Sequence, residues 1–180
     1  MREKKDVRLF FALWPDDEVR AQIASIPNQI NLDRDQCRLV KNSNLHLTLH
    51  FVGNTSFAEM KCLDLHARGF DAEAFEFTLD CSGYFKKPKV YWVGCQAVPQ
   101  ALFDLHRNLA EQISQCAYKP ETRPFSPHIT VARKITGAPG STPFVPVLWQ
   151  VGRFVLVESI SVPGDVRYEV VESYPLLAQD

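Results

Sequence analysis

Two copies of a four-residue pattern, His-x-Thr-x, stand out in this chain. Residues 46–49 read HLTL, and residues 128–131, 82 positions further on, read HITV. Both copies lie in apolar runs typical of β-strands, where side chains alternate between the two faces of a sheet. The histidine and threonine of each copy therefore share one face, and the apolar residues between them face a core. Brought together, two such strands would line a cup with two imidazoles and two hydroxyls.

This cup suits acid–base chemistry on a phosphate. Unperturbed histidine titrates at about pH 6.5, so either protonation state is accessible at neutral pH. Hydrolysis of a phosphodiester needs a base to deprotonate the attacking water and an acid to protonate the departing alkoxide. Two histidines on opposite sides of the phosphorus would meet that need, and threonine hydroxyls would hold the non-bridging oxygens. A lone strand histidine is usually structural, but the repetition of the whole pattern favours the joint catalytic role.

Metal-dependent and nucleophilic mechanisms fit the sequence poorly. His46 and His50 stand four residues apart, which on a strand separates them by roughly 13 Å, whereas ligands lie only about 2 Å from a shared ion. The sequence contains no G-x-S-x-G elbow, no glycine-rich phosphate loop and no C-x-x-C pair. We therefore expect a reaction that needs neither a metal nor a cofactor.

The bulk properties are those of an ordinary globular domain. The chain has 180 residues, of which 46% are apolar and 23% charged, and a net charge of −1. This balance gives no general attraction to long nucleic acids, so any nucleic-acid substrate would be engaged locally, at an end or at a single nucleotide. Five scattered cysteines indicate reduced thiols, and the apolar run at residues 9–14 is too short for a signal peptide or membrane span. We expect a cytoplasmic monomer that binds no membrane.

The order of the predicted elements repeats weakly along the chain. Short strands at residues 7–14 and 89–95 are each followed by a proline-initiated helix and then by a His-x-Thr-x strand. We predict an α+β fold formed by one domain over residues 1–180, with two intertwined, pseudo-symmetric lobes. Two antiparallel-rich sheets flanked by helices would share a central cleft. The predicted helices cover residues 15–27, 57–68 and 99–116, residues 82–88 form a loop, and further strands cover 38–41, 45–52, 74–81, 128–134, 147–158 and 166–173.

The twin motifs with their flanks, NLHLTLHFVG and RPFSPHITVAR, resemble the 2H phosphoesterase superfamily. The resemblance covers nearly the whole chain and is closest to the bacterial LigT/ThpR branch, the RNA 2′,3′-cyclic phosphodiesterases once named 2′-5′ RNA ligases. It implies metal-free opening of a cyclic phosphate, on an RNA end or a small nucleotide, to a 2′-phosphomonoester. His46 would be the general acid and His128 the general base, while Thr48, Thr130 and Arg133 would bind the phosphate.

Several alternatives stay open from the sequence. A non-catalytic or ligase-like binder of phosphorylated RNA ends would use the same cup, and so would a 2′-5′ phosphodiesterase. Strict alternation places Arg133 on the face opposite His128, so a bulge or the end of the strand is needed to bring it to the cleft. The same alternation places His50 on the face of His46, where it would line the cleft or cap its edge.

Other aromatic and basic residues have two readings. The aromatic residues could stack on a base and the basic residues could attract a phosphate. More commonly, such aromatic residues pack in a core and such basic residues lie in a solvated turn. His66 and His106 lie on predicted helices outside any repeated pattern, and we expect both to be structural. The aromatic and basic residues concerned are Phe10, Phe11, Tyr84, Phe85, Trp92, Lys86, Lys87 and Lys89.

Overall fold

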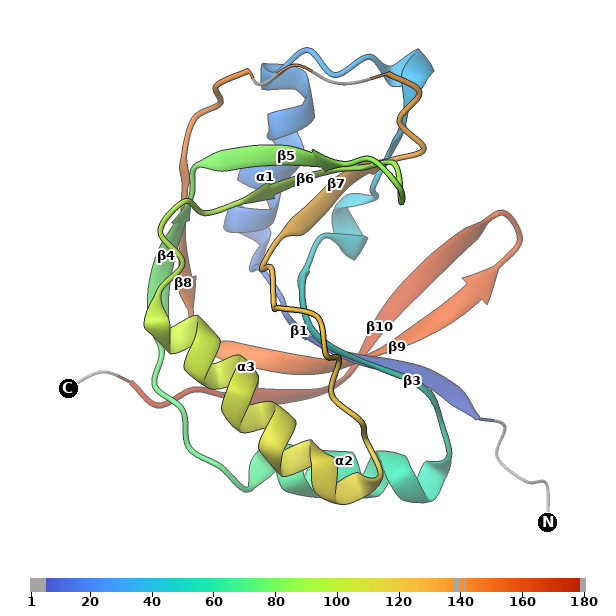
Figure 1. Cartoon of the computed structure of the whole chain (residues 1–180), viewed down its shortest axis with the longest axis vertical. Helices are drawn as coiled ribbons and strands as arrows, with labels where there is room; N and C mark the ends of the chain where they lie inside the picture. Colours follow the sequence, from blue (N-terminus) through green and yellow to red (C-terminus); the bar gives the residue numbers. More distant parts are fainter. Residues whose placement is uncertain (1–5, 138–139, 141, 179–180) are drawn as a thin grey trace.

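The chain forms an α+β fold, as predicted, with antiparallel sheets and three α-helices in its described part (Figure 1). A computed structural model describes residues 6–137, 140 and 142–178. The helices are α1 (Asp17–Gln29), α2 (Phe57–Arg68) and α3 (Gln100–Ile113), with short 3₁₀ turns η1 (Arg34–Gln36), η2 (Asn42–Asn44) and η3 (Ser114–Cys116). The strands are β1 (Val7–Leu13), β2 (Arg38–Leu39), β3 (Leu47–Thr55), β4 (Phe75–Leu79), β5 (Cys81–Phe85), β6 (Val90–Gly94), β7 (Ile129–Arg133), β8 (Val147–Val151), β9 (Arg153–Val162) and β10 (Asp165–Pro175).

Both motif strands lie in the middle of one eight-stranded sheet. Its order is β10-β9-β1-β3-β7-β6-β5, with β2 beside β7, and β4 pairs with β8 in a separate two-stranded sheet. The sheets are therefore unequal, and the motifs are not divided between them. The main sheet is nevertheless built alike on either side of its centre, because β1 and β6 flank the two motif strands β3 and β7.

The helices cross between the two halves of the main sheet. Helix α1 follows β1 in the chain but contacts β7 and β8, whereas α3 follows β6 and contacts β3 and α2 (Figure 1). The buried stripe of α3 has the helical spacing that the sequence predicted, with Leu102, Leu105, Leu109 and Ile113 all at most 2% exposed. This exchange of helices fixes the two halves to each other through a common core.

Several element boundaries differ from the predictions. Helix α1 continues through Pro27 to Gln29, because a proline in the last turn loses only one hydrogen bond and its carbonyl still accepts from the amide of Leu32. Residues 82–85, predicted as part of a loop, belong to strand β5. The long strand predicted for residues 147–158 is split at Gly152 between the two sheets. Helix α3 ends at Ile113, and η3 completes the predicted span.

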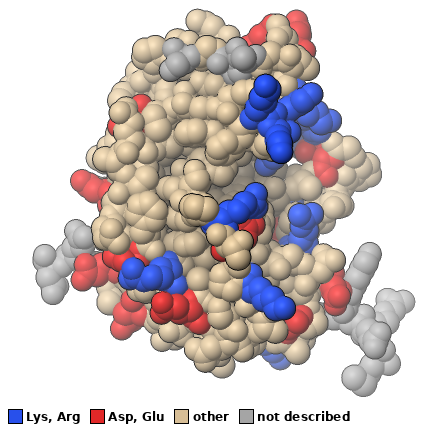
Figure 2. Space-filling model, viewed as in Figure 1, with Lys and Arg blue, Asp and Glu red and all other residues tan. Residues whose placement is uncertain are grey.

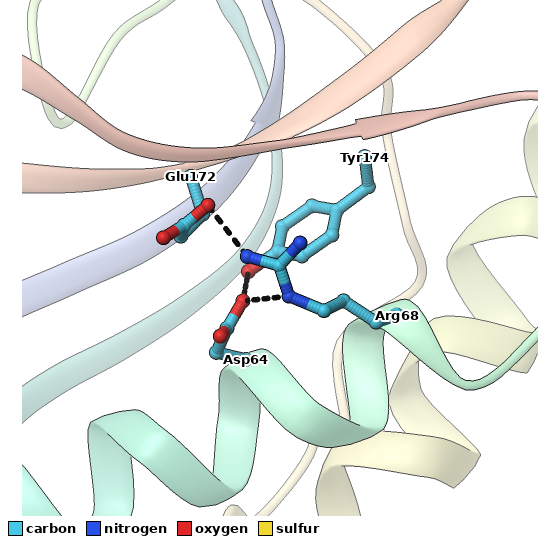
Figure 3. Close-up of polar contacts among 4 residues, drawn as sticks. All are labelled: Asp64, Arg68, Glu172 and Tyr174. Carbon is cyan, nitrogen blue, oxygen red and sulfur yellow. Dashed lines mark hydrogen bonds and ion pairs between the residues drawn. The ribbon is translucent and has the colours of Figure 1, made fainter.

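Helix α2 is fixed at both ends by polar contacts. Ser56 and Glu59 form the capping box that the sequence predicted at its start. At its end, Arg68 forms ion pairs with Asp64 at 2.9 Å and with Glu172 of β10 at 2.6 Å (Figure 3). The hydroxyl of Tyr174 also donates to Asp64 (Figure 3). These contacts tie α2 to strand β10, the edge strand of the main sheet.

The cysteines correct one prediction. Cys62 of α2 and Cys116 of η3 form a disulfide, whereas we expected only reduced thiols. The two residues are 54 positions apart and approach only because α2 packs against α3 and η3, so their spacing in sequence carried no signal. Cys37, Cys81 and Cys95 are free. Among the described residues, no helix is long and apolar enough to cross a membrane.

Candidate active site

The two motifs meet at a single residue pair. Leu47 of β3 pairs antiparallel with Ile129 of β7, and both are essentially fully buried. Each stands between the histidine and threonine of its motif, so both His–Thr pairs emerge on the opposite face of the sheet. Their four side chains are all half-buried, in contrast to the buried residues between them. Because the strands run in opposite directions, the histidine of each motif lies toward the threonine of the other.

Each histidine is held in the same way by the backbone. The Nδ1–H of His46 donates to the carbonyl of Asn44 at 2.7 Å, and the Nδ1–H of His128 donates to the carbonyl of Ser126 at 2.7 Å. In both cases the acceptor is the residue two positions earlier. This contact occupies Nδ1 in each motif, so Nε2 is the nitrogen that remains available for proton exchange. The Oγ1 of Thr48 lies 3.0 Å from Nε2 of His46 and donates to it when the imidazole is neutral.

A hydrogen bond to strand β10 holds the turn before the first motif in place. Asn44, in η2, is 8% exposed, and its Nδ2 donates to the carbonyl of Val166 at 2.9 Å. The same residue supplies the carbonyl that holds His46. The sequence placed an Asn-Ser-Asn turn here but gave no sign that it orients the imidazole, because the bracing strand comes more than a hundred residues later.

Aromatic rings surround His46. Trp14 stacks on the imidazole with centroids 5.7 Å apart, and Phe10 and Tyr168 approach to 4.9 and 5.1 Å. Burial among these rings is the main cause that lowers the pKa of His46 to about 4. The Asn44 carbonyl opposes this lowering, and charge on Arg133 and His128 adds to it. The imidazole is therefore neutral at pH 7 in the free cleft.

His128 is packed differently. The ring of Phe85 meets it edge-on with centroids 5.0 Å apart, and Trp92 lies 6.3 Å away. Trp92 lies over the backbone of Gly83 in the neighbouring strand, where a Cβ atom would come within 2.3 Å of the indole. The glycine therefore lets the indole lie flat across β5.

Of the five aromatic residues considered from the sequence, three lie beside the histidines. Phe10 contacts His46, and Phe85 and Trp92 contact His128. Phe11 is fully buried and packs on Phe154 and Tyr174, on the other face. Tyr84 packs against the main core. Trp14 and Tyr168, which also contact His46, were not among the aromatic residues singled out from the sequence.

A bulge in β7 decides the position of Arg133. Against β6, Thr130 is opposite Trp92 and Ala132 is opposite Tyr91, so Val131 is an extra residue in the ladder. An extra residue shifts the alternation by one, which returns Arg133 to the face of Thr130 and His128. Its positive charge is one of the smaller causes that lower the pKa of His46, after burial. The bulge that Arg133 needs to reach the cleft face is therefore present in β7.

A second bulge moves His50 out of the cleft. Against β1, Thr48 is opposite Ala12 and His50 is opposite Phe11, so Leu49 is the extra residue in β3. His50 consequently lies on the far face, 4% exposed, with Nε2–H donating to the carbonyl of His106 at 2.8 Å and Nδ1 accepting from the Tyr118 hydroxyl at 3.1 Å. The prediction that His50 lines or caps the cleft is wrong, because strict alternation does not hold here.

The surface is hollowed over the meeting point of β7 and the start of β3 (Figure 2). Lysine and arginine side chains gather on one side of this hollow, near the β5–β6 turn (Figure 2). That turn carries Lys86, Lys87 and Lys89, all exposed. They form the solvated turn that the sequence favoured, and they add positive charge beside the hollow.

Such a fold, with two His-x-Thr-x strands meeting at the centre of one sheet, is that of a 2H phosphoesterase. The chain belongs to the 2′-5′ RNA ligase superfamily, whose family model matches residues 15–161. The recognition made from the twin motifs is therefore confirmed.

Relatives of known name cover nearly the same length. An RNA 2′,3′-cyclic phosphodiesterase of Escherichia coli (strain K12) is 33% identical over 171 residues, spanning 94% of this chain and 96% of the relative. The enzyme of the same name from Thermotoga maritima is 29% identical over 92% of this chain and 93% of the relative. The crystal structure of E. coli LigT in its apo form superposes with a TM-score of 0.86 at 31% identity, covering 97% of this chain and 99% of that one.

Proposed function

We propose that this chain hydrolyses the 2′,3′-cyclic phosphate at an RNA end to a 2′-phosphomonoester without a metal ion. The observation that carries the proposal is the Leu47–Ile129 pair, which brings two His–Thr pairs to one face, with Nδ1 rather than Nε2 of each histidine bound to the backbone. Relatives over the full length are named for this reaction. Crystal structures of E. coli LigT complexed with 3′-AMP and with phosphate support binding of a phosphorylated nucleotide.

In the proposed reaction, water attacks phosphorus opposite O3′. The Nε2 of His128 accepts the proton of that water as the general base. The P–O3′ bond breaks, and Nε2–H of His46 protonates O3′ as the general acid. The hydroxyls of Thr48 and Thr130 donate to the non-bridging oxygens, and Arg133 faces their charge. The phosphate remains on the 2′ oxygen.

The protonation state of His46 sets a condition on this mechanism. A pKa of about 4 in the free cleft leaves the imidazole neutral at pH 7, and a neutral imidazole with Nδ1–H cannot protonate O3′ from Nε2. A bound phosphodiester carries a negative charge directly beside Nε2, and an adjacent opposite charge raises a histidine pKa. Binding of the substrate would therefore raise the pKa of His46 and favour the protonated imidazole that the reaction needs as its acid.

The same observation favours a second candidate, a protein that binds phosphorylated RNA ends without turnover. If the anion fails to raise the pKa of His46 sufficiently, the cleft would hold the phosphate between Thr48, Thr130 and Arg133 and have no acid. A 2′-5′ phosphodiesterase would need the same acid and base, so only the product or the substrate separates it from the first proposal.

The deciding experiment uses a short RNA that ends in a 2′,3′-cyclic phosphate, incubated with the protein in excess EDTA. Phosphorus NMR of the product should show a 2′-phosphomonoester. A 3′-phosphate product would overturn the proposed regiochemistry, and a loss of activity in EDTA that a divalent ion restores would overturn the twin-histidine mechanism. Tight binding with no product would favour the second candidate. An RNA with one internal 2′-5′ linkage, tested in parallel, reports that alternative activity.

A further inference from the structure

Three metal-binding side chains converge away from the cleft, between α2 and η3. Cys62 and His66 are one helical turn apart on α2, at the i, i+4 spacing that places both on one face of a helix. Cys116 of η3 approaches the same face. One ligand atom from each of the three residues lies within 4.8 Å of the other two.

The disulfide between Cys62 and Cys116 occupies this position in the structure. Its two Cα atoms are 5.7 Å apart, and both cysteines point toward His66. Two thiolates bound to one tetrahedral zinc ion at about 2.3 Å each stand about 3.7 Å apart. Rotation of the two cysteine side chains is sufficient for that separation, so the backbone that supports the disulfide also supports shared ligation of an ion.

We propose that Cys62, His66 and Cys116 bind a thiophilic divalent ion, with Zn²⁺ as the first candidate, whenever the disulfide is reduced. A dithiol reductant would give two electrons to the disulfide, become a cyclic disulfide itself, and leave two thiols. Zinc would then displace both thiol protons and accept the Cys62 and Cys116 thiolates and one His66 nitrogen, releasing two protons to solvent. Two thiolates also balance the charge of the ion.

The ligand set and its surroundings suit zinc better than harder ions. Thiolate and imidazole ligands select zinc over magnesium or calcium, which prefer oxygen. Cys116 is 8% exposed, and Cys62 and His66 are half-buried, so the ion would be only partly hydrated. Cys116, alone of the three, also lines a cavity of about 280 Å³ together with Tyr118 and Lys119.

The disulfide and the bound ion would each cross-link α2 and η3. Cys116 is followed by Ala117, whose φ of 62° turns the chain, and then by Tyr118, which contacts His50 behind the cleft. From there the chain runs through Phe125, whose ring stacks on His106, to His128. A disulfide under oxidising conditions and a metal ion under reducing ones would both hold the start of this segment against α2.

The test uses the full chain, reduced with a phosphine, stripped of metal and then titrated with Co²⁺ and Zn²⁺. Reduced protein should bind one equivalent of Co²⁺ with a thiolate-to-cobalt charge-transfer band that Zn²⁺ abolishes, and oxidised protein should show no such band. Cys62→Ser and His66→Ala should each weaken Zn²⁺ binding at least tenfold. Cys37→Ser, which changes a half-buried thiol elsewhere in the fold, is the matched control and should have no effect.

Several results would overturn the proposal. They are a missing charge-transfer band in reduced protein, an unchanged band in Cys62→Ser, equal zinc affinity in oxidised and reduced protein, and a disulfide that resists the phosphine in the native state. Cys62 is the more exposed cysteine of the pair, so its serine variant keeps the test valid if Cys116→Ser does not fold. Circular dichroism of each variant confirms that a loss of binding is not a loss of structure.

Discussion

Phe51 and Arg133 occupy equivalent positions in the two motif strands. Each stands five residues after the histidine of its motif, and each follows a bulge that returns it to the cleft face. Phe51 contacts Phe10 near His46, whereas Arg133 brings a positive charge that acts on His46. The twin motifs are almost identical in sequence, and this pair is one place where the two halves of the site differ in chemistry.

The first prediction concerns that charge. Arg133→Gln should lower kcat/KM for a cyclic phosphate by about ten- to a hundredfold, because a charge-assisted contact to the phosphate contributes about 1.5–3 kcal/mol. The control is Arg38→Gln. Arg38 pairs with Arg133 across β2 and β7 but is bound to Asp165 at 3.0 Å and to the Gly164 carbonyl at 2.8 Å. Equal effects of the two substitutions would mean that only the net charge of this edge matters.

The second prediction concerns the pKa of His46. In the free protein, histidine NMR should show this pKa near 4, where burial has lowered it. Saturation with inorganic phosphate or a 2′-phosphate nucleotide should raise it by more than about one unit, since an anion beside Nε2 favours the charged form. His50, buried on the other face with its pKa also lowered to about 4, is the internal control and should not move. An unchanged His46 pKa would remove the proposed acid.

The third prediction concerns stability and pH. Burial lowers the pKa of His50 to about 4 in the folded state, so between about pH 6.5 and pH 4 the unfolded chain binds the additional proton. Stability should therefore rise with pH in this window and be lost as the pH falls, by up to about 2 kcal/mol at pH 5 from this residue. His50→Gln should reduce that slope in urea unfolding. The same slope in the variant would assign the effect to His46 and other groups.

The fourth prediction separates acid from base. An aryl phosphodiester has a leaving group that departs without protonation, so the acid is not needed. His46→Ala should retain most activity toward it, while His128→Ala should remain impaired. The reverse result would exchange the roles of the two histidines. Equal impairment of both variants would indicate that His46 acts in binding or in positioning, rather than as the acid.

The period-two alternation of strands was sufficient to predict the central pairing of the site. It placed His46 with Thr48 and His128 with Thr130, and the structure places all four half-buried side chains on one face. The same rule failed one step further along each strand. An extra residue at Leu49 and at Val131 reversed the face of His50 and of Arg133, and bulges have no reliable signature in a single sequence.

Contacts between distant segments were also beyond the sequence. Tyr168 beside His46 comes from β10, and the Cys62–Cys116 disulfide depends on the packing of α2 against η3. Neither follows from local spacing, because each needs the tertiary arrangement first. Local signals did better. The capping box at Ser56 and the apolar stripe of α3 appear as predicted, because both are set by residues within a few turns of the same helix.

The most direct test of the central claim is single-turnover hydrolysis of a nucleoside 2′,3′-cyclic monophosphate in excess EDTA. We predict that the wild-type protein converts all of the bound cyclic phosphate. His46→Ala and His128→Ala should each be slower by about 10² to 10⁴-fold, the usual cost of a lost acid or base. Affinity for the 2′-phosphate product should change far less in both variants. Near-native turnover by either variant, or no turnover by the wild type in EDTA, would contradict it.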